Sequence, residues 1–249
     1  PGGGLSGGAP GKRAQPLPAG VGRYLPPGSD VLLQVHYHKS GKVETDASSV
    51  GLYFAKGPIQ KQIVAGMLTP PRKLLRPALD IPAGDSNALA RGTLELEDSF
   101  HLVAIIPHMH WLGKDFLVTA TLPDGTRRTL IKIDRWDFNW QDTYDFVEPV
   151  ALPKGTRLEL IAHFDNSEAN PANPSRPPVR VTWGEQTTNE MCIAFFQLTR
   201  DSEKLTGNGP PPSRPRPIIS FVPGMGNAEL NRDRVRDRDR DAPKPADKP

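Results

Sequence analysis

Short apolar runs separated by turn residues dominate the middle of the chain. They are rich in Val, Ile, Leu, Phe and Thr, and no run sustains helical periodicity for three turns. Turn sequences such as Pro123-Asp124-Gly125-Thr126 lie between them. This spacing predicts an antiparallel β-sandwich or barrel. The predicted strands are 31–38, 49–54, 62–68, 102–106, 116–122, 127–133, 143–147, 157–164, 179–183 and 192–198.

The two ends of the chain differ from this middle part. Residues 1–29 are rich in Gly and Pro and are expected to be extended or loop-like. From residue 201 the chain is rich in Pro and then alternates Arg with Asp. Such a stretch cannot bury enough apolar surface to offset its ordering entropy, so a disordered tail is predicted over 201–249.

Composition excludes several classes of protein. The chain has 249 residues, a formal charge of +3, and no block of Lys and Arg interleaved with aromatic residues in the part expected to fold, so nucleic acid is not an expected partner. No apolar run approaches the roughly 20 residues of a transmembrane helix. The single cysteine, Cys192, excludes an internal disulfide framework and a Cys-rich zinc site. Because Pro1 replaces an initiator Met and no signal peptide follows, we interpret the chain as an N-terminally truncated piece of a longer polypeptide.

Four of the six histidines form two His-x-His pairs, His36 with His38 and His108 with His110. On a strand, residues i and i+2 share one face about 6.6 Å apart, so two imidazoles can converge on one metal ion. The zinc templates are poorly met, because there is one cysteine and no His-Glu-x-x-His sequence. A thioether as third ligand would favour copper.

Among the four methionines, Met191 is the candidate third ligand. Met109 is expected on the opposite face from its histidine neighbours, Met67 lies in an apolar strand, and Met225 lies in the predicted tail. Met191 opens a late apolar strand, and on spacing alone a core position is the simpler interpretation of it.

Six short sequences, in the same order along the chain, resemble the copper type II, ascorbate-dependent monooxygenases, the family of peptidylglycine alpha-hydroxylating and dopamine beta-monooxygenase. They are LLQVHY (32–37), SSVGLYF (48–54), AGM (65–67), IPAG (81–84), HMHWLGK (108–114) and NEMC (189–192). The resemblance covers residues 31–198 and suggests a bacterial-type relative. It implies jelly-roll-like sandwich domains: the end of a first domain within 1–45, a second copper domain over 46–200, and the tail over 201–249.

The resemblance also implies roles for individual residues. His108, His110 and Met191 match the ligands of an oxygen-binding copper. His36 matches one ligand of a second, electron-transferring copper, whose adjacent His-His pair would lie upstream of Pro1. His38 matches no ligand. His163 stands where relatives carry the cysteine that pairs with the one after the Met, so Cys192 should be a free thiol. Two interpretations of His163 follow: a packed histidine without a role, or a residue near Met191 that supports the copper ligands.

Other positions depart from the family. Ile106, Ile193 and Phe195 replace polar residues that bind substrate in the peptidylglycine enzyme, which argues against a peptide carboxylate as substrate. His101 has no assigned role. The polar and aromatic cluster Asp137, Asn139, Trp140 and Gln141 is interpreted first as strand and hairpin packing and second as a substrate-lining group.

The hypothesis that follows is a copper-dependent monooxygenase acting on a small organic substrate with O2 and an electron donor, either ascorbate or a redox protein. Two coppers are expected in the intact protein, with one complete site here, in a periplasmic or extracellular setting. The alternative is a non-catalytic copper-binding or electron-transfer module, because a fold does not fix a function. A purely structural sandwich ranks last.

Overall fold

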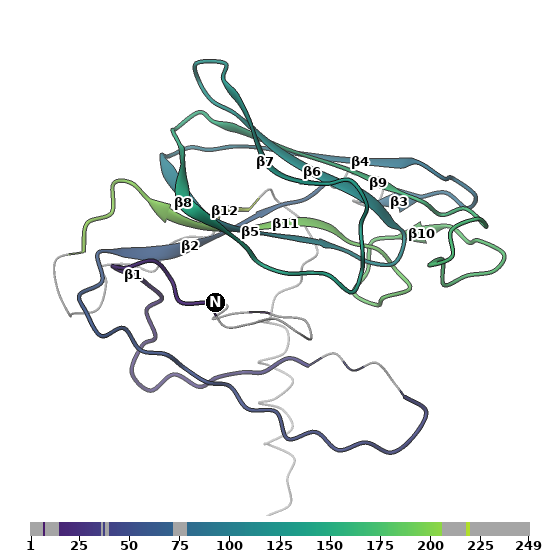
Figure 1. The fold of residues 1–249 in the computed structure, drawn as a ribbon, viewed down its shortest axis with the longest axis horizontal. Coiled ribbons are helices and arrows are strands. Elements are labelled where there is room, and N and C mark those ends of the chain that lie inside the picture. The colour runs from purple at the N-terminus through teal and green to yellow at the C-terminus, as the bar shows by residue number, and fades with distance from the viewer. Residues whose placement is uncertain are drawn as a thin grey trace, which may run out of the picture.

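Antiparallel strands form two facing sheets in the computed structural model, which describes residues 7, 15–35, 37, 40–71, 79–205 and 218–219 (Figure 1). One sheet has the order β1-β2-β11-β5-β8, with β12 also pairing with β2, and the other has the order β4-β9-β6-β7. A small third sheet joins β10 to β3. The strands are β1 (Val21–Gly22), β2 (Lys61–Leu68), β3 (Asp80–Ile81), β4 (Ala88–Glu95), β5 (Phe100–Met109), β6 (Gly113–Thr121), β7 (Arg127–Ile133), β8 (Tyr144–Leu152), β9 (Arg157–Phe164), β10 (Val181–Thr182), β11 (Cys192–Arg200) and β12 (Ile218–Ile219).

The long strands follow the order of a jelly roll. Taken along the chain, they are β2, β4, β5, β6, β7, β8, β9 and β11. The first, eighth, third and sixth of these form one sheet, and the second, seventh, fourth and fifth form the other. Two four-stranded sheets connected in this way make the double-sheet jelly roll. The predicted all-β, jelly-roll-like sandwich is therefore confirmed, and the described residues contain no helix.

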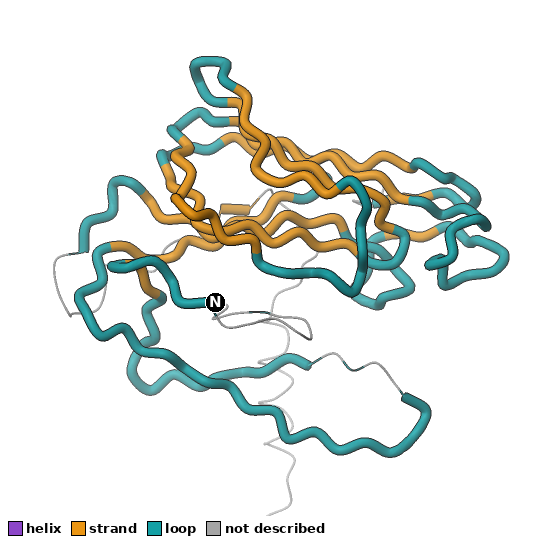
Figure 2. Tube along the Cα trace, in the orientation of Figure 1, coloured by secondary structure: helices purple, strands orange, loops and turns teal. Residues whose placement is uncertain are grey.

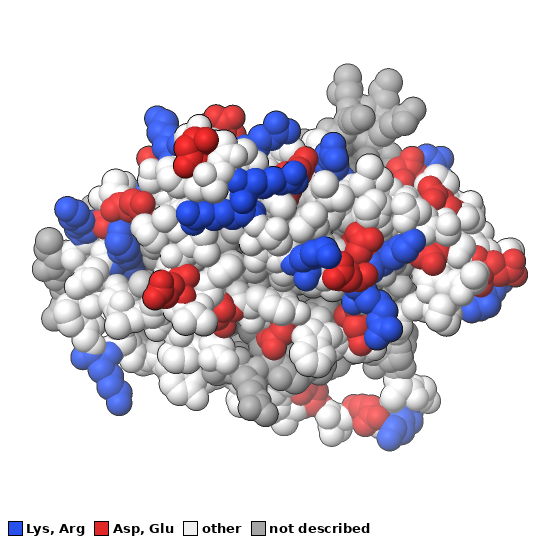
Figure 3. Space-filling model, turned by 45° about the horizontal axis from the view of Figure 1, so that its top comes forward, with Lys and Arg blue, Asp and Glu red and all other residues white. Residues whose placement is uncertain are grey.

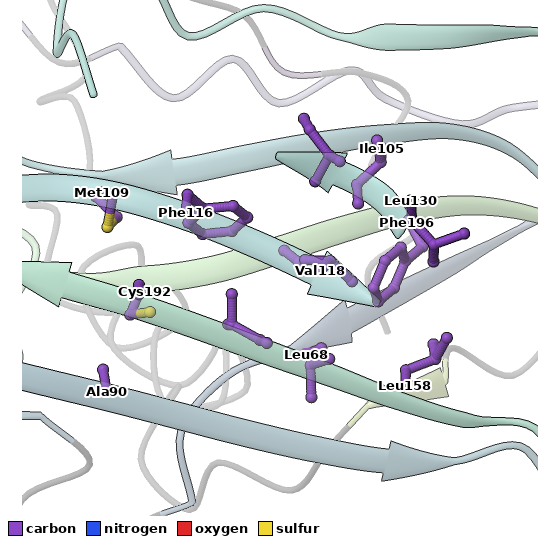
Figure 4. Close-up of a cluster of buried hydrophobic side chains, with 14 of the residues drawn as sticks. Leu68, Ala90, Ile105, Met109, Phe116, Val118, Leu130, Leu158, Cys192 and Phe196 are labelled. Carbon is purple, nitrogen blue, oxygen red and sulfur yellow. The ribbon is translucent and has the colours of Figure 1, made fainter. Parts of the chain in front are cut away.

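Alternating side chains of the two sheets fill the space between them. Along β9 the buried positions are Leu158, Leu160, Ala162 and Phe164. Along β11 they include Cys192, Ala194, Phe196 and Leu198, which belong to the same apolar core (Figure 4). Fully burying a side chain such as Leu or Phe contributes about 1.5–3 kcal/mol, so this interior stabilises the sandwich without any metal.

Most predicted strands are present, often longer than expected (Figure 2). The predictions 127–133 and 157–164 coincide with β7 and β9, whereas β5 and β8 extend beyond 102–106 and 143–147. The one long strand that the sequence did not predict is β4. Three of its four inward positions are Ala88, Ala90 and Gly92, small residues with little strand preference, and the fourth, Leu94, is only partly buried.

The predicted strands 31–38 and 49–54 are wrong for the residues that the structure describes. Residues 31–35, 37 and 49–54 belong to no strand, and Leu32 and Tyr53 are 94% and 90% exposed. A strand requires a neighbour for its backbone hydrogen bonds, and neither sheet supplies one for these residues. His36 and His38 lie outside the described residues. The proposed domain boundary at residues 45 and 46 falls in this same stretch and stays a prediction.

The predicted tail is partly ordered. The Lys61 ammonium donates to the main-chain oxygens of Arg200, Asp201 and Glu203 at 2.7, 3.0 and 3.2 Å. Ile218 and Ile219 pair with β2 in parallel. Disorder from residue 201 is thus the wrong expectation for 201–205 and 218–219, because these residues find partners on β2. Residues 206–217 and 220–249 lie outside the described part of the chain.

Charges of both signs are mixed on the face drawn in Figure 3. On the sheet β4-β9-β6-β7, Glu159 lies between Arg91 and Arg127, at 3.6 and 3.4 Å from their guanidinium nitrogens.

Within the described residues, no helix is long and apolar enough to cross a membrane.

Candidate metal centre

His108 and His110 lie together at the end of β5, on the face of the sheet that points away from the sandwich core. Met109 between them is fully buried and belongs to the core, as the strand periodicity predicts. The two imidazole centroids are 5.1 Å apart, with their planes at 84°. The sequence-predicted pair therefore converges on one side of β5.

A hydrogen bond from the β7–β8 connection fixes the protonation of the His108 ring. His108 Nδ1 lies 2.7 Å from Gln141 Oε1, and Gln141 Nε2 donates to the main-chain oxygen of Phe138 at 2.8 Å. Because the amide nitrogen already faces that carbonyl, the amide oxygen faces the imidazole and accepts from Nδ1–H. The lone pair of the neutral His108 ring is then on Nε2.

The His110 ring is fixed in the same way by main-chain oxygen. Its Nδ1 lies 3.0 Å from the carbonyl oxygen of Asn189, which can only accept, so this nitrogen carries the proton. Trp136 Nε1 donates to the main-chain oxygen of His110 at 3.1 Å and holds the backbone at this point. Both rings therefore carry an Nδ1–H and leave Nε2 free of a proton in the neutral form.

Burial keeps both imidazoles neutral. It lowers the pKa of His108 to about 4, against the opposing effect of the Gln141 hydrogen bond, and the nearby His110 lowers it further. Burial also lowers the pKa of His110, while its main-chain acceptors oppose the shift. Neutral imidazoles are the form that binds metal ions, so protons do not compete for these nitrogens at neutral pH.

Met191 lies beside the histidine pair by strand register. The β11–β5 pairing places Cys192 opposite Met109 and Ile193 opposite His108. One residue further, the same register places Met191 opposite His110. Opposite residues of an antiparallel pair point to the same face, and Met191 is only partly buried. The thioether of Met191 thus belongs to the face that carries both imidazoles.

This set of donors fits copper better than zinc or iron. Among the described residues, no group of three or more His, Cys, Asp or Glu side chains could hold a metal ion, so the histidine pair lacks a third ligand of those types. The neighbouring thioether is a soft ligand that selects Cu(I).

Glu190 connects the two strands that carry the candidate ligands. Its side chain is fully buried and accepts from the main-chain N–H groups of His110, Leu112 and Met191 at 2.8, 2.6 and 3.2 Å. Burial raises the pKa of Glu190 to about 8, although the three N–H donors oppose the shift.

Apolar and aromatic side chains surround the histidine pair. The Phe195 ring lies 6.4 Å from the His108 ring, and the Phe138 ring lies 6.3 Å from the His110 ring and stacks on Trp111 at 4.6 Å. Ile106 pairs with Phe195 and Ile193 pairs with His108, so both isoleucines share the outer face. The positions that the sequence analysis singled out as apolar are therefore next to the imidazoles.

His163 does not lie where it was expected. It belongs to β9 in the other sheet, where its chain neighbours Ala162 and Phe164 point into the core. Its own side chain points to the outer face of that sheet, and its Nδ1 lies 2.8 Å from Asp115 Oδ1. The two layers of the sandwich thus separate His163 from the face of Met191, which corrects its expected support of the copper ligands.

Two other residues are accounted for by local contacts. Cys192 is a free, fully buried thiol, and burial together with the charge of Glu190 raises its pKa, so it is inert in the core. His101 Nδ1 lies 2.6 Å from Asp201 Oδ1 at the opposite end of β5.

Sequence reasoning missed the roles of two residues, Gln141 in the β7–β8 connection and Glu190 just before β11. Gln141 was interpreted first as packing, yet it contacts a candidate ligand. Asp137 and Trp140 line a cavity of about 230 Å³ with Ile133, Arg135, Trp136 and Tyr144. Gln141 is 33 residues from His108, so no local spacing could have linked the two. For Glu190 the only signal was its position directly before Met191.

Comparison with known proteins gives one distant relative. The chain is 24% identical over 180 residues to the DBH-like monooxygenase protein 1 of Gallus gallus, which covers 67% of this chain and 27% of that protein. The chain thus spans about a quarter of the length of this curated relative. No family model matches the chain. Among solved structures, the chain is similar to one titled "Structure of infectious bursal disease virus Gt strain", with a TM-score of 0.23, 12% identity, and coverage of 78% of this chain and 54% of that one.

Proposed function

We propose that this chain carries the substrate-hydroxylating copper site of a copper-dependent monooxygenase, with His108, His110 and Met191 as the ligands. The observation that carries the proposal is the convergence of two neutral imidazoles, 5.1 Å apart, whose Nδ1 atoms are both occupied and whose Nε2 atoms are therefore available. The distant relationship to a DBH-like monooxygenase supports the same class of reaction.

Each residue of the site has a distinct part in the proposal. His108 Nε2, His110 Nε2 and the Met191 thioether would hold the metal, and copper, when bound, would supply the one-electron chemistry with O2. Gln141 and Asn189 keep the imidazoles in the tautomer that binds metal. Phe138 and Phe195 restrict the access of water to the two rings.

The surroundings favour an uncharged, apolar part of a small organic substrate next to the metal. Ile106, Ile193 and Phe195 share the outer face with His108, and none of them can pair with a carboxylate. Removing an anionic group from water to this position without a partner would cost about 3 kcal/mol or more of binding free energy. A substrate that presents a peptide carboxylate at this position is therefore disfavoured.

The complete enzyme would need more than this site. Residues 31–45 expose large apolar side chains, including Leu32 and Val43 at 94% and 95%. We assign this segment to a preceding sandwich domain, in which His36 would bind a second, electron-transferring copper. Ascorbate or a redox protein would supply the electrons, and a periplasmic or extracellular setting would supply O2 and copper.

One observation favours the alternative, a copper-binding or electron-transfer module without hydroxylation. The strand residues next to His108 on the outer face, Ile106, Ile193 and Phe195, offer no hydrogen bond that could orient a substrate. A module that stores or delivers copper needs the ligands but not a substrate contact.

An activity measurement separates the two functions. The protein joined to its upstream region is loaded with copper and supplied with ascorbate, O2 and a panel of small apolar substrates. We expect O2 uptake coupled to a hydroxylated product, lost in Met191→Leu and kept in Leu158→Met, which exchanges a core residue on β9, in the other sheet, for one of similar side-chain volume. Copper binding without product in the wild type would support the module, and product formation that survives in Met191→Leu would contradict the proposed ligand set.

A further inference from the structure

The ladder between β5 and β11 ends one residue short of the candidate ligands. The last pair in the register is Met109 with Cys192. His110 follows the end of β5 and Met191 precedes the start of β11. The ladder thus brings these two residues near each other, but no pair of the ladder fixes the spacing between them.

The Glu190 carboxylate bridges this gap. Its Oε2 accepts from the main-chain N–H of His110 at 2.8 Å and from that of Met191 at 3.2 Å, so a single oxygen atom joins the backbones of two candidate ligands. Its Oε1 accepts from Leu112 N at 2.6 Å and extends the contact along the chain after β5. Together these three hydrogen bonds tie the chain after β5 to the chain before β11.

The bridge is itself anchored. Glu190 N donates to the main-chain oxygen of Thr182, the last residue of β10, and Gly184 N donates to the main-chain oxygen of Glu190, both at 3.2 Å. The preceding residue, Asn189, accepts from the His110 ring through its carbonyl oxygen. Residues 189 and 190 thus hold the ring of His110, its backbone, and the backbone of Met191 from one fixed segment.

We propose that Glu190 is the positioning residue that sets the separation of His110 and Met191, and thereby allows the thioether to bind copper together with the imidazoles. The inference rests on the proposed copper site and adds a residue that is not itself a ligand. A glutamine has the same shape but only one acceptor oxygen: directed at His110 and Met191, it turns its NH2 group against the Leu112 N–H, and directed at Leu112, it leaves the N–H groups of His110 and Met191 without this acceptor. An aspartate keeps the charge but is one methylene shorter, so it cannot reach both strands.

The test is Cu(I) X-ray absorption and Cu(I) affinity on the full chain, measured on wild type and Glu190→Gln, with thermal unfolding alongside. We expect Glu190→Gln to keep the nitrogen shell of the two imidazoles, to lose or lengthen the sulfur contribution, and to bind Cu(I) roughly 10–100-fold more weakly. A role limited to the stability of the fold would lower the unfolding temperature and leave the sulfur shell unchanged.

The matched control is Glu203→Gln. Glu203 also accepts a main-chain N–H on the same sheet, from Gln62, and in addition the Gln62 side-chain amide, but it lies at the far end of β2 from the site. The Glu203→Gln variant should have a lower unfolding temperature than the wild type and keep the wild-type copper spectrum. If Glu190→Gln does not fold, Glu190→Asp replaces it with the same expected loss of sulfur, and loss of the fold in both variants would overturn the proposal. A wild type without a sulfur shell would refute the copper site itself, whereas a sulfur shell that persists in Glu190→Gln would refute only the role of Glu190.

Discussion

At the scale of single residues, the site combines ligands that are close in sequence with supports that are not. The His108-x-His110 spacing was enough to predict that both imidazoles share a face, because strand periodicity is a local property. Gln141 and Glu190 reach the pair from 33 and 80 residues away. Their contacts depend on how the β7–β8 connection and the start of β11 fold back onto β5, which no local pattern encodes. The expected place of His163 came instead from the cysteine position of the resembling family, and in this fold that position lies on β9, in the other sheet.

The contact between Gln141 and His108 yields a prediction about copper affinity. Gln141→Met keeps the side-chain length but removes the acceptor for His108 Nδ1–H, so the ring loses its fixed tautomer and orientation. Removing such a support typically costs about 10–100-fold in metal affinity. Competition for Cu(I) against a chelator such as bicinchoninate should show this loss.

Asn139→Ala is the control for that variant, since Asn139 is an exposed residue of the same connection. Its Cu(I) affinity should equal that of the wild type. Equal affinities for Gln141→Met and the wild type would show that the hydrogen bond does not support the ring.

At the scale of elements, strands with a clear alternation of large apolar residues were predictable and strands built from small residues were not. β9 alternates Leu158, Leu160, Ala162 and Phe164 toward the core, and its bounds match the prediction. β4 escaped notice because three of its four inward residues, Ala88, Ala90 and Gly92, are small. The opposite error occurred at 49–54, where an apolar run remains unpaired because no strand in the described chain lies beside it.

Gly92 explains why β4 uses small residues. A Cβ at this position would lie 2.6 Å from the main-chain oxygen of Thr69, which follows β2. The end of one sheet therefore approaches the other too closely for a side chain, and the obstacle is backbone rather than a flexible side chain. Overpacking of this kind typically costs about 1–3 kcal/mol.

We therefore expect Gly92→Ala to lower the free energy of unfolding by about 1–3 kcal/mol in a denaturant titration. Gly57→Ala is the control, since a Cβ there meets no atom within 4 Å. An unfolding free energy of Gly92→Ala equal to that of the wild type would show that β2 and β4 separate at little cost.

At the scale of the whole molecule, the fold and the site are separable. The core lies between the two sheets, whereas the histidine pair lies on the outer face of one of them. Loss of a ligand should thus remove the metal without unfolding the protein. The sequence could predict the sandwich because many short alternating strands leave few other folds.

The most direct test of the central claim is the copper stoichiometry and Cu(I) X-ray absorption spectrum of this chain, wild type beside Met191→Leu, with the unfolding temperature of each. We expect one copper per chain with a sulfur scatterer at about 2.3 Å in the wild type, no such scatterer in Met191→Leu, and equal unfolding temperatures for the metal-free proteins. A wild type that binds no copper, or binds it with nitrogen and oxygen scatterers alone, would contradict the ligand set and leave a sandwich without this metal site.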